Sequence, residues 1–560
     1  MDIKNVIAQS IAFEGKSIDF LPLITETQDK SNGDYTITCF SLAKIFKKSP
    51  VQIANEIKEN FKQNKFIDKI EVVNGYVNLF VNRQNFIKEV LEELSSEKLF
   101  EKDPQNKEKT ICVEYCSINL AKYMHIGHLS TTMIGESLAR IFTELGYNTK
   151  RLNYVGDFGT PFGKMVYAFL EWGNEKELTR GVDYIQELYV KFCALAENDP
   201  SLEEKAREYF KKICEKEEPA YSIYQKFIEI SKKENERLLD MMGVHFDSWK
   251  GESAYSDQLE NVIKMLQDKK LLVESNGAKM VDLDEYGLGK CLVEKSDGTS
   301  LYATRDIAAA IDRYNTYHFE KMFYVTAVQQ KLHFQQFFKV LELLGYQFSQ
   351  NLTHVQYGMF SLPTGKIASR KGKQAVLVDL IDYALNKARS MVVDRSFDEK
   401  TQEVVAQKIA FSALRFSAIK NERIKDTVFD IENAFSFEGD TSAYIQYTYA
   451  RMCSILRKVG DIDLTSIDFS YLNSEPVASV MIAVNKFQNV LTKSAEQSEP
   501  SIISKYTLDL CKLINKFYSQ EKVLSTNLEM TKAKVFFLVS LQKLLLKLFN
   551  ILCIDVLEEM

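Results

Sequence analysis

The chain contains few of the residues that mark fibrous, disordered or disulfide-rich secreted proteins. Among 560 residues there are only 9 prolines, 23 glycines and 9 cysteines, whereas hydrophobic residues make up 45% and charged residues 26%. This balance is typical of an ordered, helix-rich globular protein. The cysteines are scattered, and the close pair Cys112 and Cys116 has no second pair at zinc-ligand spacing. We therefore predict reduced thiols and no bound metal.

Long apolar runs and a targeting segment are also missing. The first residues include acidic side chains and lack the basic region and apolar core of a signal peptide. Residues 535–552 are very apolar, but polar side chains interrupt them, which predicts a buried amphipathic helix and no membrane span. The interrupting residues are Ser540, Gln542, Lys543, Lys547 and Asn550. We expect a cytoplasmic protein that binds no membrane.

An excess of positive charge is lacking as well. The formal net charge is −6 and the sequence pI about 5.8, which argues against a simple nucleic-acid binder because such proteins are usually basic. Two local segments, residues 366–373 and 420–425, are rich in Lys and Arg. They are candidate contacts for phosphates, although a solvated charged face explains them equally well.

The length predicts three or four domains. Residues 1–105 mix helical periodicity with an alternating run over residues 70–80, in which Gly75 and Asn78 are turn candidates, so a small α+β domain is expected. The polar stretch 95–109 is a linker candidate. From about residue 400 onward there is almost no strand signal, and an all-helical C-terminal domain is predicted over residues 386–560.

The central region, residues 106–385, predicts a parallel sheet. A strand candidate at 111–116 is followed by a turn, a helix that Gly146 would end, and a second strand candidate at 149–155. Strand, loop, helix, strand is the unit that builds nucleotide-binding sheets. Further strand candidates are residues 322–327 and 354–360, and a helical insertion is expected at about 165–255. The fold class predicted is thus an α/β Rossmann-like, HUP-type catalytic domain between the two smaller domains.

His125-Ile126-Gly127-His128 stands in the turn between the first strand and its helix. Gly127 lets the backbone approach a ligand, and two histidines at a helix N-terminus place N–H donors where a triphosphate can sit. Imidazoles there can bond the α-phosphate more strongly in the transition state. The alternative is that both are ordinary turn histidines with capping roles.

Strand, HIGH and helix together resemble the class I aminoacyl-tRNA synthetases, whose second signature is a KMSKS-type loop. The counterpart is residues 366–372, KIASRKG, which departs from the pattern at Ile367, Ala368 and Ser369. The resemblance implies ATP binding by Lys366, Ser369, Arg370 and Lys371 together with His125, Gly127 and His128. Many arginine-specific members lack the second KMSKS lysine and carry one just before HIGH, where Lys122 stands. The implied catalytic residues are His125, His128 and Lys122.

Other motifs resemble the arginyl family specifically. Residues 114–122, EYCSINLAK, are similar to that family's E-x-S-S-P-N-x-A-K, with Cys116 and Ile118 as departures. Residues 156–163, 301–306 and 324–333 match further family segments. The resemblance assigns arginine recognition to Glu114, Ser117, Asn119, Tyr302, Asp306 and Gln330.

The assignment makes physical sense for a guanidinium, which presents a planar fork of donors that carboxylates accept in pairs. Glu114 lies inside an apolar strand candidate, so it should face a polar cleft and a cationic partner, for which a ligand guanidinium would serve. Tyr302 and Asp306 are four residues apart, on one face of a helix start. Taken singly, each residue has an ordinary alternative, such as a salt bridge for Glu114 or a surface amide for Gln330.

The tRNA contacts are predicted outside the central region. Residues 436–451 resemble the start of the family's anticodon-binding domain, expected over about 436–560, in which Tyr444 and Tyr447 can stack on bases and Arg451 can contact phosphate. A core-facing aromatic stripe is the alternative. By resemblance, Met560 also lies near the anticodon, and Asp34 and Tyr35 contact the tRNA elbow.

The resemblance implies ATP-dependent ligation of L-arginine to tRNA(Arg) through an arginyl-adenylate, with Mg²⁺ accompanying ATP and with activation that requires tRNA. It further implies a cytoplasmic monomer with no DNA partner and no permanently bound metal or organic cofactor. Two rival hypotheses remain open. One is another HIGH-type nucleotidyltransferase or a synthetase for a different amino acid, and the other is a catalytically silent protein that only holds tRNA.

Overall fold

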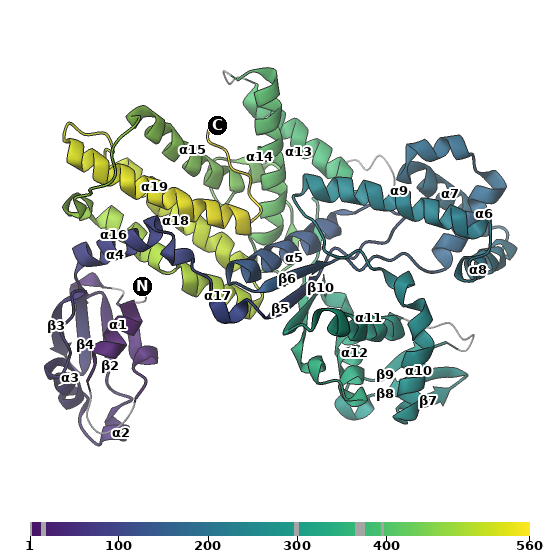
Figure 1. Cartoon of the computed structure of the whole chain (residues 1–560), viewed down its shortest axis with the longest axis horizontal. Helices are drawn as coiled ribbons and strands as arrows, with labels where there is room; N and C mark the ends of the chain where they lie inside the picture. Colours follow the sequence, from purple (N-terminus) through teal and green to yellow (C-terminus); the bar gives the residue numbers. More distant parts are fainter. Residues whose placement is uncertain (1–2, 13–17, 28, 296–301, 364–375, 394–396) are drawn as a thin grey trace.

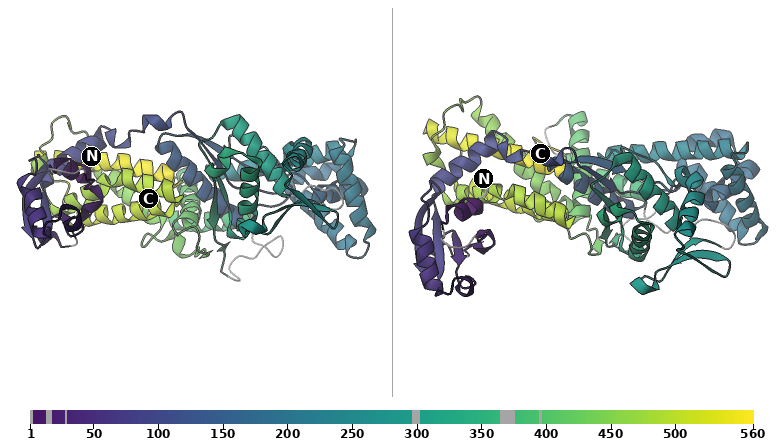
Figure 2. Two further views of the ribbon diagram at one scale, coloured as in Figure 1. Left: turned by 90° about the horizontal axis from the view of Figure 1, so that it is seen from below. Right: turned by 60° about the horizontal axis from the view of Figure 1, so that its bottom comes forward.

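The computed structural model spans residues 1–560 and describes all of them except 1–2, 13–17, 28, 296–301, 364–375 and 394–396. The molecule is elongated, with an N-terminal α+β domain at one end and a helical insertion at the other (Figure 1). Between them lie the C-terminal helices and a parallel sheet. Two further views show the same order of parts (Figure 2).

The N-terminal domain is the predicted small α+β unit, a four-stranded antiparallel sheet of order β1-β2-β4-β3 with helices packed on it. Its elements are α1 (Ile3–Ser10), β1 (Ile24–Glu26), β2 (Tyr35–Thr38), α2 (Ala43–Phe46), α3 (Pro50–Glu59), β3 (Ile67–Val73), β4 (Tyr76–Val81) and α4 (Arg83–Ser95). The predicted linker region 95–109 holds two short 3-10 turns, Lys98–Phe100 and Pro104–Asn106.

One turn candidate of this domain was wrong. The other candidate, Gly75, was right: the β3–β4 hairpin turns at Asn74 and Gly75, which both have positive φ. Asn78, in contrast, lies within β4 and is buried. The hydroxyl of Thr36 on neighbouring β2 donates to its Oδ1 over 2.8 Å, so a cross-strand partner satisfies a polar side chain that sequence alone associates with turns.

The central sheet is parallel throughout and has the order β11-β10-β5-β6. Its strands are β5 (Thr110–Glu114), β6 (Asn148–Leu152), β10 (Lys321–Ala327) and β11 (Leu352–Tyr357), close to the predicted ranges. Helix α5 (Ile126–Glu144) connects β5 to β6, and Gly146 follows its end with φ of 97°. The first half of the sheet runs outward from β5 and the second half outward from β10. The switch point between β5 and β10 is where ligands bind in such sheets.

The predicted insertion is helical, and it is followed by elements that were not anticipated. Its helices are α6 (Thr160–Trp172), α7 (Val182–Ala196), α8 (Ser201–Cys214) and α9 (Ala220–Met241). After α10 (Leu259–Asp268) comes an antiparallel sheet of β7 (Leu272–Ser275), β8 (Ala278–Asp282) and β9 (Lys290–Glu294). Helices α11 (Tyr302–Tyr317) and α12 (Lys331–Leu344) then flank β10 in sequence.

The C-terminal region is helical as predicted, apart from the two-residue pairing of β12 (Phe360–Ser361) with β13 (Thr427–Val428). Its helices are α13 (Leu377–Val392), α14 (Glu399–Ile419), α15 (Ser442–Val459), α16 (Glu475–Asn485), α17 (Phe487–Gln497), α18 (Ser501–Gln520) and α19 (Leu528–Ile551). The apolar run 535–552 falls on α19, whose many buried residues confirm a core helix. Among the described helices, none is both long and apolar enough to cross a membrane.

Candidate active site

A cavity of about 700 Å³ opens at the carboxyl ends of β5 and β10. It is lined by many of the side chains that the sequence singled out, which come from four separate segments of the chain. These are Glu114, Ser117, Asn119, His125, Gly127, His128, Asp306 and Gln330. The switch point of the sheet therefore brings the predicted imidazoles and carboxylates to one place.

The imidazoles of His125 and His128 cap the start of α5. The backbone N–H of Gly127 donates to Nδ1 of His125 over 3.1 Å, and the N–H of His125 donates to Nδ1 of His128 over 3.0 Å. The two rings are tilted by 33° to each other, with their centroids 3.8 Å apart. A β-carbon on Gly127 would stand 2.9 Å from the ring of His125, so glycine permits this close packing.

This geometry sets the protonation of both rings. Burial lowers the pKa of His125, and it lowers the pKa of His128 to about 3, where the neighbouring imidazole acts in the same direction. Both imidazoles are therefore neutral near pH 7. Because each Nδ1 accepts a backbone hydrogen bond, the remaining proton sits on Nε2. The helix start thus carries two neutral N–H donors beside its own backbone amides, an arrangement suited to phosphate.

The cavity is also lined by the carboxylates of Glu114, Glu252 and Asp306, which form an acidic wall. Asp306, on the first turns of α11, has its Oδ2 2.5 Å from Nε2 of His333 at the start of α12. Glu252 lies 3.3 Å from Nε of Arg305. Burial raises the pKa of Glu252 to about 7, Arg305 opposes that shift, and the nearby carboxylates of Asp306 and Asp157 add to it. A raised carboxyl pKa indicates that the cavity is short of positive charge, which a cationic ligand would supply.

Glu114 ends β5 and is almost fully buried. The sequence predicted a cationic partner and suggested that a ligand guanidinium would serve. The partner in the structure is the chain's own Arg313, whose Nη2 lies 2.5 Å from Oε2 of Glu114. Burial raises the pKa of Glu114 to about 7, although Arg313 pulls it down, and Asp306 raises it further. Glu114 nevertheless lines the cavity, so it remains next to the space for a ligand.

The turn after β5 is strained. Cys116 and Ser117 have φ of 70° and 48°, a conformation that non-glycine residues rarely adopt. The N–H of Ser117 donates to Oδ1 of Asn153 over 3.1 Å. Among the described residues, the buried hydroxyls of Ser117 and Tyr154 have no hydrogen-bond partner, and both line the cavity. Such groups are satisfied when a polar ligand binds.

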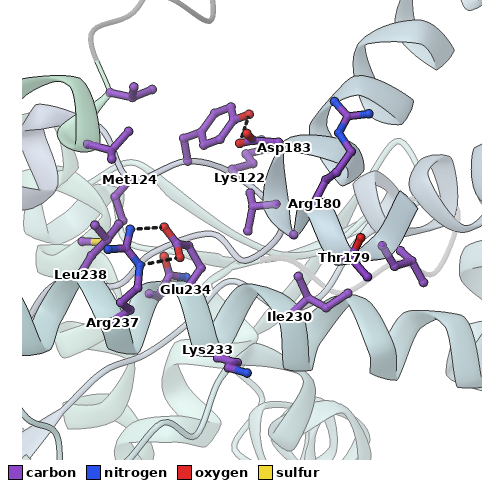
Figure 3. A pocket seen from close by; sticks show the side chains of 17 residues that line it. Lys122, Met124, Thr179, Arg180, Asp183, Ile230, Lys233, Glu234, Arg237 and Leu238 are labelled. Atoms are coloured by element: carbon purple, nitrogen blue, oxygen red, sulfur yellow. Dashed lines mark hydrogen bonds and ion pairs between the residues drawn. The ribbon is translucent and has the colours of Figure 1, made fainter. Parts of the chain in front are cut away.

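Lys122 does not line this cavity. It contributes to a second cavity of about 660 Å³, which Met124 also lines (Figure 3). Its ammonium lies 5.7 Å from the centroid of the Tyr189 ring. Arg180, Lys233 and Arg237 also line this second cavity. The structure thus separates the predicted catalytic lysine from the imidazoles while keeping it next to them in sequence.

Several predicted residues fall outside the described part of the chain. Lys366, Ser369, Arg370 and Lys371 lie in residues 364–375, and only the helical backbone of Tyr302 is described. The first described residue after this segment, Val376, forms an antiparallel β-bridge with His125.

The predicted tRNA contacts lie on other domains. On α15, Tyr447 is 43% exposed, whereas Tyr444 is partly buried and its hydroxyl accepts from Nδ2 of Asn515 over 3.0 Å. The guanidinium of Arg451 lies 4.9 Å from the Tyr518 ring centroid. The aromatic stripe is therefore split, with one ring facing outward.

The other predicted tRNA contacts, Met560, Asp34 and Tyr35, are less exposed to solvent than Tyr447. Met560 packs partly buried against the core. Tyr35 is buried, and the carboxylate of Asp34 accepts from the backbone N–H of Val81 over 2.9 Å. Both line a small crevice between the N-terminal domain and α16.

Sequence reasoning missed several residues that line the first cavity. Tyr154 and Gly156 follow the carboxyl end of β6, a position that predicts a site residue in a parallel sheet, so that signal was available. Glu252 had no such signal, because its place in the cavity depends on the folding of a distant segment over the sheet. His333 ends the segment 324–333 that resembles the arginyl family, but no role was predicted for it. Among the residues that the structure describes, no group of three or more His, Cys, Asp or Glu side chains is placed to hold a metal ion.

Comparisons with known proteins agree along the chain. Family models match for the arginyl tRNA synthetase N-terminal domain over residues 1–81, the catalytic domain of class I (R) tRNA synthetases over 89–431, and the DALR anticodon binding domain over 445–560. The arginine–tRNA ligase of Clostridioides difficile (strain 630) is 41% identical over 517 residues, which cover 92% of this chain and 91% of that protein. That of Clostridium botulinum (strain Alaska E43 / Type E3) is 40% identical over 568 residues, with all of both chains covered.

Solved structures agree in fold. The arginyl-tRNA synthetase of Thermus thermophilus superposes with a TM-score of 0.82 at 22% identity, covering 100% of this chain and 99% of that one. The arginyl-tRNA synthetase of Plasmodium falciparum gives a TM-score of 0.81 at 24% identity, with 100% and 98% covered. The arrangement of three domains is therefore shared over the full length.

Proposed function

The chain belongs to the arginyl-tRNA synthetase family, whose function is to charge tRNA with arginine at the expense of ATP, and we propose that the cavity between α5 and α11 is where this chain activates arginine. The observation that carries the proposal is the pairing of two neutral imidazoles with an acidic wall across one space of about 700 Å³. One side suits a triphosphate and the other a guanidinium. A single cavity can therefore hold both substrates in reach of each other.

The ATP half of the proposal depends on the start of α5. His125 and His128 would donate from Nε2 to the α-phosphate, and the positive end of the helix would add to this attraction. Neutral donors keep their hydrogen bonds across the physiological pH range, since the pKa of each ring lies below its usual value. As negative charge is redistributed around the α-phosphorus, these donors would stabilise the transition state more than the ground state.

The arginine half depends on the acidic wall. Asp306 and Glu252 would accept the cationic groups of arginine, and Glu114, already paired with Arg313, would fix the back of the pocket. The polar groups of Ser117, Asn119 and Gln330 would bind the α-amino and carboxylate groups, with Tyr302 placed beside them by family resemblance. His333 would hold the carboxylate of Asp306 in place through its 2.5 Å contact.

The reaction proceeds in two steps in this proposal. The carboxylate of arginine attacks the α-phosphate of Mg-ATP in line, the bond to the β-phosphate breaks, and pyrophosphate leaves with the electron pair. A ribose hydroxyl of the terminal adenosine of the tRNA then attacks the carbonyl carbon of the adenylate and releases AMP. Contacts to the leaving phosphates would come from Lys122, Lys366, Ser369, Arg370 and Lys371. Mg²⁺ enters as part of the nucleotide substrate.

Contacts to tRNA are proposed for the terminal domains. The outward ring of Tyr447 is the best-placed stacking surface on α15, with Tyr444 and Arg451 behind it and Met560 at the end of the chain. Asp34 and Tyr35 would act by shaping the surface of the N-terminal domain that meets the tRNA elbow. Residues 1–105, 106–385 and 386–560 are proposed as the domain boundaries.

Tyr447→Ala tests the role of α15. Because stacking of a base on an aromatic ring is worth about 1–3 kcal/mol, we expect the KM for tRNA to rise at least fivefold while the KM for arginine stays constant. Tyr286→Ala is the matched control, since Tyr286 is 41% exposed and lies between β8 and β9, outside the C-terminal domain. Equal effects of the two substitutions on the KM for tRNA would remove Tyr447 from the tRNA contact.

We further propose that the protein acts in the cytoplasm as a monomer, without a DNA partner and without a resident cofactor. The decisive experiment for the activity is to supply bulk tRNA, Mg-ATP and each labelled amino acid in turn. Arginine alone should be esterified to tRNA. Charging with a different amino acid would favour another class I specificity, and no charging with any of them would favour a protein that only holds tRNA.

A further inference from the structure

The carboxylate of Glu136 lies buried in the middle of α5, ten residues beyond its first residue, Ile126, and outside the substrate cavity. Three side chains converge on it. The hydroxyl of Tyr115 donates to Oε2 over 2.5 Å, Nε of Arg151 lies 3.1 Å from the same oxygen, and Nε of Arg140 donates to Oε1 over 2.6 Å. A buried charge keeps such a full set of partners because leaving any of them unpaired is costly.

Tyr115 connects this carboxylate to the substrate turn. It stands between Glu114 and Cys116, and its ring is fully buried against Gly135 of α5, where an added β-carbon would come within 2.2 Å of the ring. The next two residues are the pair with positive φ. Their strained conformation persists only if the surrounding structure holds it, and the Tyr115–Glu136 bond holds the residue immediately before it.

Arg140 connects the same carboxylate to two distant segments. Its Nη1 donates to the backbone carbonyl of Asn550 at the end of α19 over 2.8 Å, and its Nη2 donates to that of Gly243, just after α9, over 2.8 Å. The end of the C-terminal domain and the end of the helical insertion therefore meet at one guanidinium. Helix α5 packs against α14 and α19 at this place.

Arg415 on α14 repeats this connection. Its Nη1 donates to the carbonyl of Cys553 over 3.1 Å and to Oδ2 of Asp555 over 2.9 Å, while its Nη2 donates to the carbonyl of Met241 over 2.7 Å. Two arginines thus bind the same pair of segments, residues 241–243 and residues 550–555.

The network also reaches α15. Nε2 of Gln446, which is fully buried, donates to the backbone carbonyl of Asp555 over 2.9 Å and to the hydroxyl of Ser412 over 3.1 Å. Its neighbour in sequence is Tyr447, the exposed ring of the proposed anticodon contact. Polar contacts, linked through the short backbone segments 241–243 and 550–555, therefore connect α15 to the turn at Ser117.

We propose that Glu136 is a positioning residue for arginine activation, and that the C-terminal domain holds the strained Cys116–Ser117 turn in its substrate-binding form through Arg415, Arg140, Glu136 and Tyr115. The proposal rests on the function assigned above to the cavity. Displacement of the segment 550–555 would move Arg140, withdraw a donor from Glu136 and loosen Tyr115. Binding of tRNA to α15 would then change the conformation of the Cys116–Ser117 turn where arginine binds.

Tyr115→Phe is the first test, because it removes one hydroxyl and preserves the packing of the ring. We expect kcat/KM for arginine in arginine-dependent ATP–pyrophosphate exchange with tRNA present to fall roughly tenfold, the effect of losing a charge-assisted hydrogen bond, with an unchanged KM for tRNA. Tyr506→Phe is the matched control. Its buried hydroxyl donates to the carbonyl of Ala483 within the C-terminal domain, off the network. If both variants behave alike, or if Tyr115→Phe lowers only the melting temperature, the proposal is overturned.

Asp555→Asn supplies the second test at the far end of the network, where the side chain is partly exposed and the fold is less at risk. Alone it should lower kcat/KM for arginine a few-fold. Combined with Tyr115→Phe it should show less than the product of the two single effects, because one path would already be interrupted. Strictly multiplicative effects would overturn the coupling. If the wild-type protein does not charge tRNA with arginine, the function itself fails, and that outcome is distinct from either result.

Discussion

The two cavities to which residues 122–128 contribute are similar in size and opposite in charge. The first, of about 700 Å³, joins the imidazoles of α5 to the carboxylates of Asp306 and Glu252. The second, of about 660 Å³, is lined by Lys122, Arg180, Lys233 and Arg237 together with Asp183 and Glu234. One short segment thus presents its histidines to an acidic space and its lysine to a space with several cations.

This difference assigns separate tasks to residues that sequence alone placed together. An acidic cavity with buried carboxylates of raised pKa attracts a guanidinium, whereas a cavity lined by exposed cations attracts phosphate. The ammonium of Lys122 is exposed, so screening by water and salt limits its contribution. The acidic cavity should therefore control arginine use and the basic cavity should adjust the rate more weakly.

The largest effect is expected from His128→Ala, which removes an N–H donor from the acidic cavity. Loss of one preorganised donor to a developing charge typically lowers kcat by about 10²–10³-fold, and we expect that loss in aminoacylation. The fold should persist, because the ring makes one capping bond worth about 1 kcal/mol. His318→Ala, at the exposed end of α11, is the control. Near-normal charging by His128→Ala would remove this residue from the mechanism.

The second-largest effect is expected from Asp306→Ala, mainly on kcat/KM for arginine. Removing a partly buried carboxylate that pairs with a ligand cation costs about 2–4 kcal/mol, so kcat/KM for arginine should fall about 100-fold while the KM for ATP stays constant. Asp312→Ala on the same helix is a matched control, since the side-chain exposures of Asp306 and Asp312 are 21% and 23% and Asp312 pairs with Lys250 instead. Unchanged saturation with arginine would contradict the assignment.

The acidic cavity should also make arginine binding depend on pH. Burial raises the pKa of Glu252 to about 7, so below that pH the carboxyl is increasingly protonated and loses the charge that would pair with a cation. The KM for arginine at saturating Mg-ATP should therefore rise about tenfold from pH 8 to pH 6, as expected for one proton. Glu252→Gln should weaken this dependence. A flat wild-type profile over the same range would be inconsistent with a cation held by these carboxylates.

The smallest effect is expected in the second cavity. Lys122→Ala should lower kcat by no more than about fivefold, because an exposed charge contributes at most about 1 kcal/mol, and the KM for arginine should not change. Lys232→Ala on α9 is the control, since it is also exposed and pairs with Glu236 outside the cavity. A loss as large as that of His128→Ala would break the contrast between the cavities and show that the contact of Lys122 with the leaving phosphates matters as much as that of the imidazoles.

The sequence predicted those parts of the fold and site that depend on local patterns. Strand, HIGH turn and helix were found because apolar periodicity and the capping histidines lie within one short segment, β5 to α5. The sequence could not show which aromatic ring of α15 faces outward, because tertiary packing decides it: Tyr444 is partly buried and Tyr447 is exposed.

The features that were missed depend on contacts between distant segments. Arg313 was not foreseen as the partner of Glu114, because it lies 199 positions further along the chain on α11. Glu136 looks like an ordinary helix carboxylate until folding brings Tyr115 and Arg151 to it and the ends of α9 and α19 hold its third partner, Arg140. The short sheet β7–β9 was overlooked as well, since its strands are few in residues and only partly buried.

The central claim is that one cavity holds a phosphate at the imidazoles and a guanidinium at the carboxylates. A crystal structure with a non-hydrolysable arginyl-adenylate analogue tests it most directly. We predict the phosphate oxygens within hydrogen-bond distance of Nε2 of His125 or His128, and the cationic groups of the arginine moiety against Asp306 and Glu252. An analogue bound on another surface, or bound here with its guanidinium away from both carboxylates, would contradict the account.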